Sequence, residues 1–244
     1  MRLEGKTAVV TGGARRIGRA IALALAAKGM NVVVNYNRSR REAQETVMEA
    51  RALGANAIAI KADVTREGDV ERLFRKTLHA FGRVDALINN AALFERAYIT
   101  SMPLASWERM IRTNLTGVFL CSREAARAML AQRDGGKIVN IADWTPEQPI
   151  KGYAHYSASK AGVVALTRAL ALELAPKITV NCVAPGAILL PKHYGPTYVS
   201  TMLKSIPLKR FGTPDEVAHA VIFLLENDYA TGSVLTIDGG RSLV

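Results

Sequence analysis

Residues 6–18 read KTAVVTGGARRIG, a short apolar run followed by a glycine-containing loop. The run Lys6–Thr11 has the β-branched composition of a buried strand. After Gly18, apolar residues recur at helical spacing until Gly29, which predicts a helix that ends there. A strand, a glycine loop and a helix in this order favour phosphate binding, because small residues let backbone N–H groups approach a pyrophosphate at the helix N-terminus.

The next apolar run, Asn31–Tyr36, indicates which dinucleotide would bind. It is followed by Asn37, Arg38 and Ser39, where an acidic residue would hydrogen-bond a free ribose diol. An arginine with amide and hydroxyl neighbours suits a ribose 2′-phosphate instead. The sequence therefore predicts NADPH as the cofactor in preference to NADH.

The rest of the chain alternates between strand and helix patterns without a linker or a repeat. The predicted helices are 39–53, 68–80, 107–132, 153–174 and 214–226, and the further predicted strands are 55–61, 85–88, 138–141, 177–183 and 233–237. This alternation predicts one α/β domain over residues 1–244, a Rossmann-type doubly wound parallel sheet with helices on both faces. Ligands of such a sheet bind at the carboxyl ends of its strands.

Composition narrows the class of protein. A chain of 244 residues with 49% hydrophobic and 22% charged residues is typical of a folded globular protein. No apolar segment resembles a signal peptide or a membrane span, so we expect a soluble, cytoplasmic protein that does not bind membranes. Cys121 and Cys182 lie in apolar patterns and are predicted to be buried free thiols, and the four scattered histidines predict no metal site.

The net charge of +11 admits two interpretations, nucleic-acid binding or attraction of a small polyanion. Arginines concentrate in two places, residues 15–19 and residues 38–41, and no aromatic residues interleave with them as a base-stacking surface requires. The distribution favours the small anion, and we expect no nucleic-acid partner.

A second informative stretch, residues 137–160, reads KIVNIADWTPEQPIKGYAHYSASK. Its apolar start predicts a buried strand, and the part after Pro149 predicts a helix on which Tyr156 and Lys160 share one face. A lysine beside a phenol favours the ionised phenol, which brings the tyrosine toward use as a proton donor near neutral pH.

The spaced motifs together resemble the short-chain dehydrogenase/reductase superfamily over essentially the full length. The resemblance rests on Thr11–Gly18, Asp63, Asn89–Ala91, Asn114, Tyr156, Lys160, Pro185–Gly186 and Asp238–Gly240. It implies that Tyr156 is the proton donor, that Lys160 binds the nicotinamide ribose and lowers the tyrosine pKa, and that Asn114 holds a water in a proton relay. It also implies a homotetramer. The cofactor contacts expected from the motifs and the resemblance are Gly12, Arg16, Ile17, Asn37, Arg38, Ser39, Asp63, Val64, Asn90, Ala91, Tyr156, Lys160, Pro185 and Gly186.

Two positions depart from the usual pattern of that superfamily: Arg16 stands where most members have glycine, and Asp143 stands where most have serine. An ionised carboxylate repels the negative charge that develops on a carbonyl oxygen during reduction, and suits a substrate with ring N–H donors. Both departures resemble the pteridine reductase branch, in which an aromatic residue at the position of Phe94 stacks on the substrate. The resemblance implies that Arg16 reaches the cofactor phosphates and the pterin edge. Substrate contacts are then expected from Arg16, Phe94, Asp143 and Tyr156, whereas Ala92 and Ile188 lack the hydroxyl groups common in that branch.

The sequence thus predicts an NADPH-dependent reductase of dihydropterins or dihydrofolate, with Asp143, Tyr156, Lys160 and Asn114 as its catalytic residues. One alternative is a carbonyl reductase of the same superfamily that acts on 3-oxoacyl thioesters, sugars or ketones, and another is a non-catalytic nucleotide-binding regulatory protein. Phe94 also suits core packing, and Asp143 also suits a surface loop of an inactive member. Residues 188–212 are expected to cover the substrate, with an irregular stretch at 191–207, and Trp144 and His155 are expected to pack or to line the rim.

Overall fold

The computed structural model describes residues 1–189 and 195–244, which hold one sheet of seven parallel strands. The strands lie in the order β3-β2-β1-β4-β5-β6-β7. They are β1 (Thr7–Val10), β2 (Asn31–Tyr36), β3 (Ala57–Lys61), β4 (Ala86–Asn89), β5 (Gly136–Ile141), β6 (Ile178–Pro185) and β7 (Val234–Ile237). The chain adds strands outward from β1 to β3 and then returns to add β4 on the other side of β1. The boundary between β1 and β4 is therefore the topological switch point, where such sheets bind their ligands.

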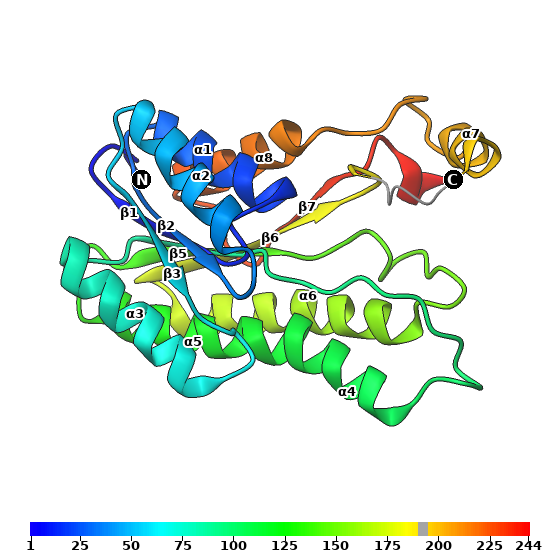
Figure 1. Cartoon of the computed structure of the whole chain (residues 1–244), viewed down its shortest axis with the longest axis horizontal. Coiled ribbons are helices and arrows are strands. Elements are labelled where there is room, and N and C mark those ends of the chain that lie inside the picture. Colours follow the sequence, from blue (N-terminus) through cyan, green and yellow to red (C-terminus); the bar gives the residue numbers. More distant parts are fainter. Residues whose placement is uncertain (190–194) are drawn as a thin grey trace.

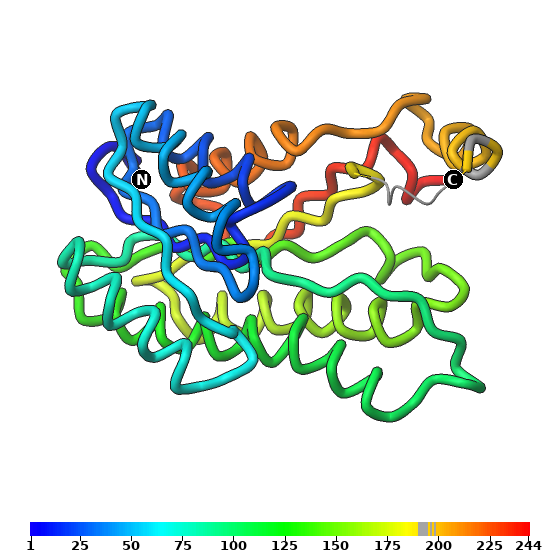
Figure 2. Tube along the Cα trace, viewed as in Figure 1, coloured from blue at the N-terminus to red at the C-terminus, as the bar shows by residue number. Residues whose placement is uncertain are grey.

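Helices cover both faces of the sheet, which confirms the predicted doubly wound α/β fold (Figure 1). One face carries α1 (Arg16–Ala27), α2 (Arg40–Ala52) and α8 (Pro214–Glu226), and the other carries α3 (Glu67–Phe81), α4 (Leu104–Ile111), η1 (Arg112–Thr116), α5 (Gly117–Leu130) and α6 (Ala154–Leu174). The trace in Figure 2 shows α7 (Pro196–Lys204) and the C-terminal turn η2 (Arg241–Leu243) together at one end of the molecule. These last two elements lie beyond the carboxyl ends of β6 and β7.

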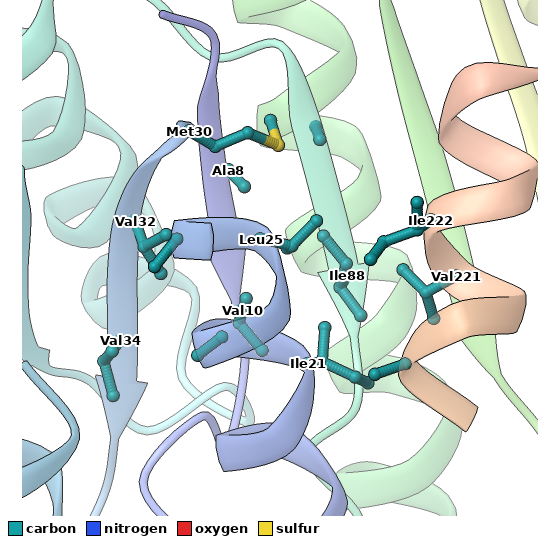
Figure 3. Close-up of a cluster of buried hydrophobic side chains, with 14 of the residues drawn as sticks. Ala8, Val10, Ile21, Leu25, Met30, Val32, Val34, Ile88, Val221 and Ile222 are labelled. Atoms are coloured by element: carbon teal, nitrogen blue, oxygen red, sulfur yellow. The ribbon is translucent and has the colours of Figure 1, made fainter. Parts of the chain in front are cut away.

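Strand β1 is buried along its whole length because both faces of the central sheet are covered. Alternate side chains enter two different cores: Val10 packs with Ile21 and Leu25 of α1, and Val9 packs on the opposite face with Leu87. Figure 3 shows the first of these cores between β1, α1 and α8. Full burial of an isoleucine or leucine side chain contributes about 1.5–3 kcal/mol, so this packing fixes the glycine loop after β1 to a rigid base.

Two features differ from the sequence-based expectation. The predicted helix 107–132 contains a π-helical turn, η1, between α4 and α5. Residues 191–207 were expected to be irregular, but residues 196–204 form α7, while residues 191–194 lie outside the described part of the chain. The prolines of this stretch indicated a loop. Pro196 instead occupies the first turn of a helix, where its missing N–H costs no hydrogen bond. The remaining boundaries agree to within one or two residues.

Candidate active site

A cleft of about 990 Å³ opens at the carboxyl ends of the strands, around the switch point between β1 and β4. Its wall is built from the segments that follow β1, β2, β3, β4, β5 and β6 in turn. The predicted site residues that line it are Gly12, Arg16, Ile17, Asn37, Arg38, Ser39, Asp63, Val64, Asn90, Ala91, Phe94, Asp143, Tyr156, Lys160, Pro185 and Gly186. The cleft therefore brings together residues that are up to 174 positions apart, from Gly12 to Gly186.

The glycine loop packs so closely against the end of β4 that no side chain fits at Gly18. A Cβ atom at Gly18 would collide with the Gly12 carbonyl oxygen and lie 2.5 Å from Asn90 Nδ2. Gly12 itself has a φ of 61°. The Asn90 amide donates to the carbonyl oxygens of Thr11 (2.9 Å) and Gly12 (3.2 Å), so it braces the loop. The loop opens at the N-terminus of α1, the end of a helix that attracts phosphate.

Arg16 is the one loop residue with a strained backbone. Its φ of 54° lies in the left-handed region, where a non-glycine residue costs about 1 kcal/mol or more. Its guanidinium donates to the carbonyl oxygen of Leu189 at 2.8 Å. Arg16 thereby links the glycine loop to the segment after β6, across the mouth of the cleft.

The residues after β2 and β3 form one polar corner of the cleft. Asn37, Arg38 and Ser39 follow β2, and no acidic side chain stands among them. Asp63 follows β3 and accepts hydrogen bonds from the Thr65 backbone (3.0 Å) and hydroxyl (2.7 Å). Burial of Asp63 raises its pKa, but these bonds outweigh that effect and hold the pKa below its usual value, so the carboxylate is ionised. The geometry offers a cation at Arg38 for an anionic group and a carboxylate acceptor at Asp63.

The predicted catalytic side chains meet where β5 ends and α6 begins. Tyr156 and Lys160 lie one turn apart on α6, with side chains that are buried in the cleft wall. The Tyr156 hydroxyl donates to Asp143 Oδ2 at 2.8 Å, and the Lys160 ammonium donates to the Ile141 carbonyl oxygen at 2.8 Å. Asp143 Oδ1 accepts the backbone N–H of Thr145 at 2.9 Å.

Burial moves all three of these groups toward their neutral forms. It raises the pKa of Asp143 and lowers that of Lys160. The pKa of Tyr156 is raised well above its usual value by burial first, and then by the charge and hydrogen bond of Asp143. The expectation that Lys160 lowers the tyrosine pKa is therefore not met here, because the nearest polar partner of the phenol is a carboxyl group and the ammonium is turned to Ile141.

Asn114 does not line the cleft; it lies behind the wall in the π-helical turn η1. Its Oδ1 accepts the Leu93 backbone N–H at 2.7 Å, and its Nδ2 donates to the Leu93 carbonyl at 3.0 Å and to Ser159 Oγ at 3.2 Å. The extra residue of the π turn directs this side chain inward between α6 and the segment after β4. A role for Asn114 in a water relay stays a prediction.

Aromatic side chains form the outer wall beside Tyr156. Phe94 stacks on Tyr153 with ring centroids 4.6 Å apart and planes at 13°, and meets Tyr156 edge-on at 4.8 Å. The Phe94 side chain is still 45% exposed. Sequence reasoning missed Tyr153, although its position three residues before Tyr156 on the same helical start was a usable signal.

The C-terminus closes the opposite side of the cleft. The Arg241 guanidinium lies over the Trp144 ring at 4.4 Å, and Gln148 Nε2 donates to the Ser242 (3.1 Å) and Val244 (2.8 Å) carbonyl oxygens. Trp144 is buried, as expected of a packing residue. Arg241 was missed because nothing in the sequence pairs it with a loop about 100 residues earlier.

No described helix has the length and apolar character needed to cross a membrane. Within the same residues, no three His, Cys, Asp or Glu side chains gather as metal ligands would. Cys121 and Cys182 are buried free thiols, and burial raises their pKa values to about 12 and about 11.

Comparison with known proteins decides the family. Residues 12–242 match a family model described as enoyl-(acyl carrier protein) reductase. A solved short-chain dehydrogenase/reductase mutant from Serratia marcescens superposes with a TM-score of 0.93 at 34% identity, over 99% of this chain and 100% of that one. The chain belongs to the short-chain dehydrogenase/reductase family. Membership makes it an oxidoreductase and supports the predicted NADPH cofactor.

Relatives within the short-chain dehydrogenase/reductase family correct the predicted substrate. A 3-oxoacyl-[acyl-carrier-protein] reductase from Synechocystis is 43% identical over 242 residues, covering 98% of this chain and 97% of that protein. The corresponding reductase from Staphylococcus epidermidis is 40% identical over 240 residues, covering 96% and 98%. The assignment to the pteridine reductase branch, with a dihydropterin or dihydrofolate substrate, was wrong.

The structure gives a physical reason for this error. The three residues taken as signs of a pterin site already have partners within the protein. Phe94 stacks on Tyr153, Arg16 binds the Leu189 carbonyl, and Asp143 accepts from Tyr156. The identities of these three residues could not reveal their partners, because the partners lie elsewhere in the chain.

Proposed function

We propose that this protein is an NADPH-dependent carbonyl reductase whose substrate is a 3-oxoacyl thioester. The observation that carries the proposal is the Tyr156 hydroxyl in the cleft wall, one helical turn from Lys160, in a chain 43% identical to a 3-oxoacyl-[acyl-carrier-protein] reductase. The sequence admits this function as an alternative, and the relatives favour it over a pterin reductase.

The glycine loop fits the pyrophosphate of a dinucleotide. Gly12 and Gly18 carry no side chains beside the N-terminus of α1, which leaves backbone N–H groups accessible to phosphate oxygens. Arg38 would hold the ribose 2′-phosphate, and Asp63 and Val64 would border the adenine. Bound NADPH supplies the hydride that is added to the carbonyl carbon of the substrate.

The charge of the cleft suits phosphate-bearing ligands. The arginines that line it are Arg15, Arg16, Arg38, Arg109, Arg112 and Arg241. The cofactor carries several phosphates, and the coenzyme and carrier-protein forms of an acyl thioester carry further ones. Part of the net charge of +11 thus faces the cleft, where low-dielectric walls focus the field on anions.

The chain's own residues provide the proton and exclude water. Tyr156 gives its proton to the substrate oxygen as the hydride reaches carbon, and the positive charge of Lys160 stabilises the negative charge that develops. The aromatic wall of Phe94 and Tyr153 shields this step from solvent and offers an apolar surface to the acyl chain.

The test is NADPH oxidation by the purified protein with acetoacetyl-coenzyme A, compared with a simple ketone and with NADH. We expect turnover of the thioester with NADPH. The Tyr156→Phe variant should lose about 100-fold or more of kcat while still binding NADPH. Tyr229→Phe is the matched control, because Tyr229 is 101% exposed and lies outside the cleft. Absence of thioester turnover, or full activity of Tyr156→Phe, would contradict the proposal.

A homotetramer also remains our expectation for this family. Analytical ultracentrifugation of the purified protein would test it, and a monomer at micromolar concentration would count against it.

A further inference from the structure

Asp143 poses a chemical problem for the proposed reaction. It lies within hydrogen-bond distance of the phenol that must release a proton. If Asp143 is ionised, it holds that proton on Tyr156, and it repels the negative charge that develops on the substrate oxygen. A carbonyl reductase with an ionised carboxylate at this point would work against its own reaction.

The contacts of Asp143 suit a carboxylic acid as well as a carboxylate. Oδ1 accepts the Thr145 backbone N–H at 2.9 Å, so this oxygen acts as the carbonyl acceptor of the group. Oδ2 lies 2.8 Å from the Tyr156 oxygen, and a single hydrogen can bridge these two oxygens from either side. A neutral Asp143 would therefore carry its proton on Oδ2, directed at the phenol.

The groups around Asp143 favour its ionised form, but less strongly than burial opposes it. From α6 come Tyr156 and Lys160, and the Lys160 ammonium donates to the Ile141 carbonyl oxygen. From β6 comes Cys182, which lies beside Lys160 and whose thiol is neutral because burial raises its pKa to about 11. On the Asp143 loop itself, the neighbouring Trp144 ring lies under the Arg241 guanidinium. Burial raises the pKa of Asp143 despite the opposing hydrogen bonds of Thr145 and Tyr156 and the charge of Lys160.

We propose that Asp143 acts as a neutral carboxylic acid that passes its Oδ2 proton to Tyr156 while Tyr156 passes its own proton to the substrate oxygen. This inference rests on the proposed carbonyl reductase function. The O–H bond of Asp143 breaks as a new O–H bond forms on the phenol, and the old phenol O–H bond breaks as the substrate alcohol forms. The carbonyl is reduced by the hydride, the cofactor is oxidised, and a solvent proton later restores Asp143.

This relay also keeps the charge of the site balanced. Loss of the Asp143 proton would leave one negative charge in the cleft, which would offset the positive charge that bound NADPH would gain on giving up its hydride. The phenol stays neutral throughout, which its burial favours. A serine at this position, the usual residue in this family, can donate a hydrogen bond but cannot release a proton near neutral pH.

The first experiment is the pH profile of kcat/KM for thioester reduction in the wild type, Asp143→Asn and Asp143→Ser. The wild type should lose activity as pH rises through the pKa of Asp143, which burial raises above the ordinary aspartate value. Asp143→Asn should lose this descending limb and about 100-fold of kcat, because an amide donates a hydrogen bond but releases no proton. Asp143→Ser should lose the limb and retain turnover. A limb that persists in both variants would overturn the proposal.

The second experiment does not depend on turnover. Infrared difference spectra of wild type minus Asp143→Asn, both bound to NADPH, should show a protonated carboxyl C=O band at pH 7 that disappears as pH rises. A carboxylate signal alone at pH 7 would overturn the proposal. If the thioester is not reduced, the proposed function fails, yet the infrared band still reports the state of Asp143, so the two failures are distinguishable.

Discussion

The side chain of Asn114 and the backbone of Leu93 form a closed pair of hydrogen bonds, with Oδ1 accepting the N–H at 2.7 Å and Nδ2 donating to the carbonyl at 3.0 Å. Leu93 precedes Phe94, so the two hydrogen bonds to Asn114 fix the position of the Phe94 ring beside Tyr156. A third bond from Asn114 to Ser159 ties the same segment to α6. Helix α6 and the segment that carries Phe94 are thus held in register by one buried amide.

Asn114→Ala should destabilise the protein by about 2–3 kcal/mol, because it leaves the N–H and the carbonyl of Leu93 without their partners. It should also raise the KM for substrate through a displaced Phe94. Urea unfolding and hydrogen exchange at the Leu93 amide would measure both the loss and its location. Ser159→Ala is the control: it removes one contact of Asn114 but keeps both bonds to Leu93, and should cost about 1 kcal/mol. Equal losses of stability in the two variants would contradict the role given to the hydrogen bonds between Asn114 and Leu93.

Arg38 should decide between the two nicotinamide cofactors. Replacing it by alanine should remove the charge-assisted contact that we propose to the ribose 2′-phosphate. Such a contact is worth about 1.5–3 kcal/mol, so the Kd for NADPH should rise about 10- to 100-fold. The Kd for NADH should stay unchanged. Fluorescence titration with both cofactors measures the pair of values. Arg40→Ala is the matched control, since Arg40 begins α2 and does not line the cleft. If the Kd values for NADPH and NADH rise equally in Arg38→Ala, Arg38 does not bind the 2′-phosphate.

Arg16 combines an unfavourable backbone with a favourable side-chain contact, and two substitutions separate them. Both Arg16→Gly and Arg16→Ala remove the bond to Leu189, but only glycine relieves the positive φ of 54°. After allowance for the greater freedom of glycine in the unfolded chain, Arg16→Gly should be about 0.5–1 kcal/mol more stable than Arg16→Ala. Urea midpoints compare them directly. A less stable glycine variant would show that the loop gains nothing from relief of this backbone conformation.

The sequence predicted the fold well because its signals were local. Runs such as Val32–Val34 could only be strands covered on both faces, and the glycine loop after β1 required a helix start at that point. Tyr156 and Lys160 were placed correctly on one helix face for the same reason. These inferences needed only the spacing of residues along the chain.

The substrate was misjudged because it depends on contacts between distant residues. Spacing could not reveal that Phe94 stacks on Tyr153 or that Arg16 reaches Leu189. Asp143 was expected to be an ionised carboxylate, whereas burial beside Tyr156 raises its pKa. Arg241 and the π turn at Asn114 gave no sequence signal that was separable from an ordinary tail and an ordinary helix.

Glu216 should make the stability of the fold depend on pH. It completes the capping box of α8 with Thr213 and pairs with Arg210, which follows α7 on the way to α8. The hydrogen bond from Arg210 and then that from the Thr213 backbone lower the pKa of Glu216 from 4.5 to about 2. Because the folded-state pKa is depressed, the stabilisation is present above pH 4.5 and is lost as pH falls toward 2.

Glu216→Ala should therefore cost about 1 kcal/mol at pH 7, an amount limited by the partial exposure of the pair. Glu216→Gln should cost less, because glutamine still completes a capping box, and its difference from the wild type should shrink as pH falls from 4.5 toward 2. Urea unfolding at pH 7 and at pH 3 measures this. Asp215→Asn, in the same first turn, is the control, and should lose only a few tenths of a kcal/mol through the helix dipole. A Glu216→Gln deficit that stays constant down to pH 3 would mean that the charge of Glu216 contributes nothing to the fold and that the capping hydrogen bonds alone hold this end of α8.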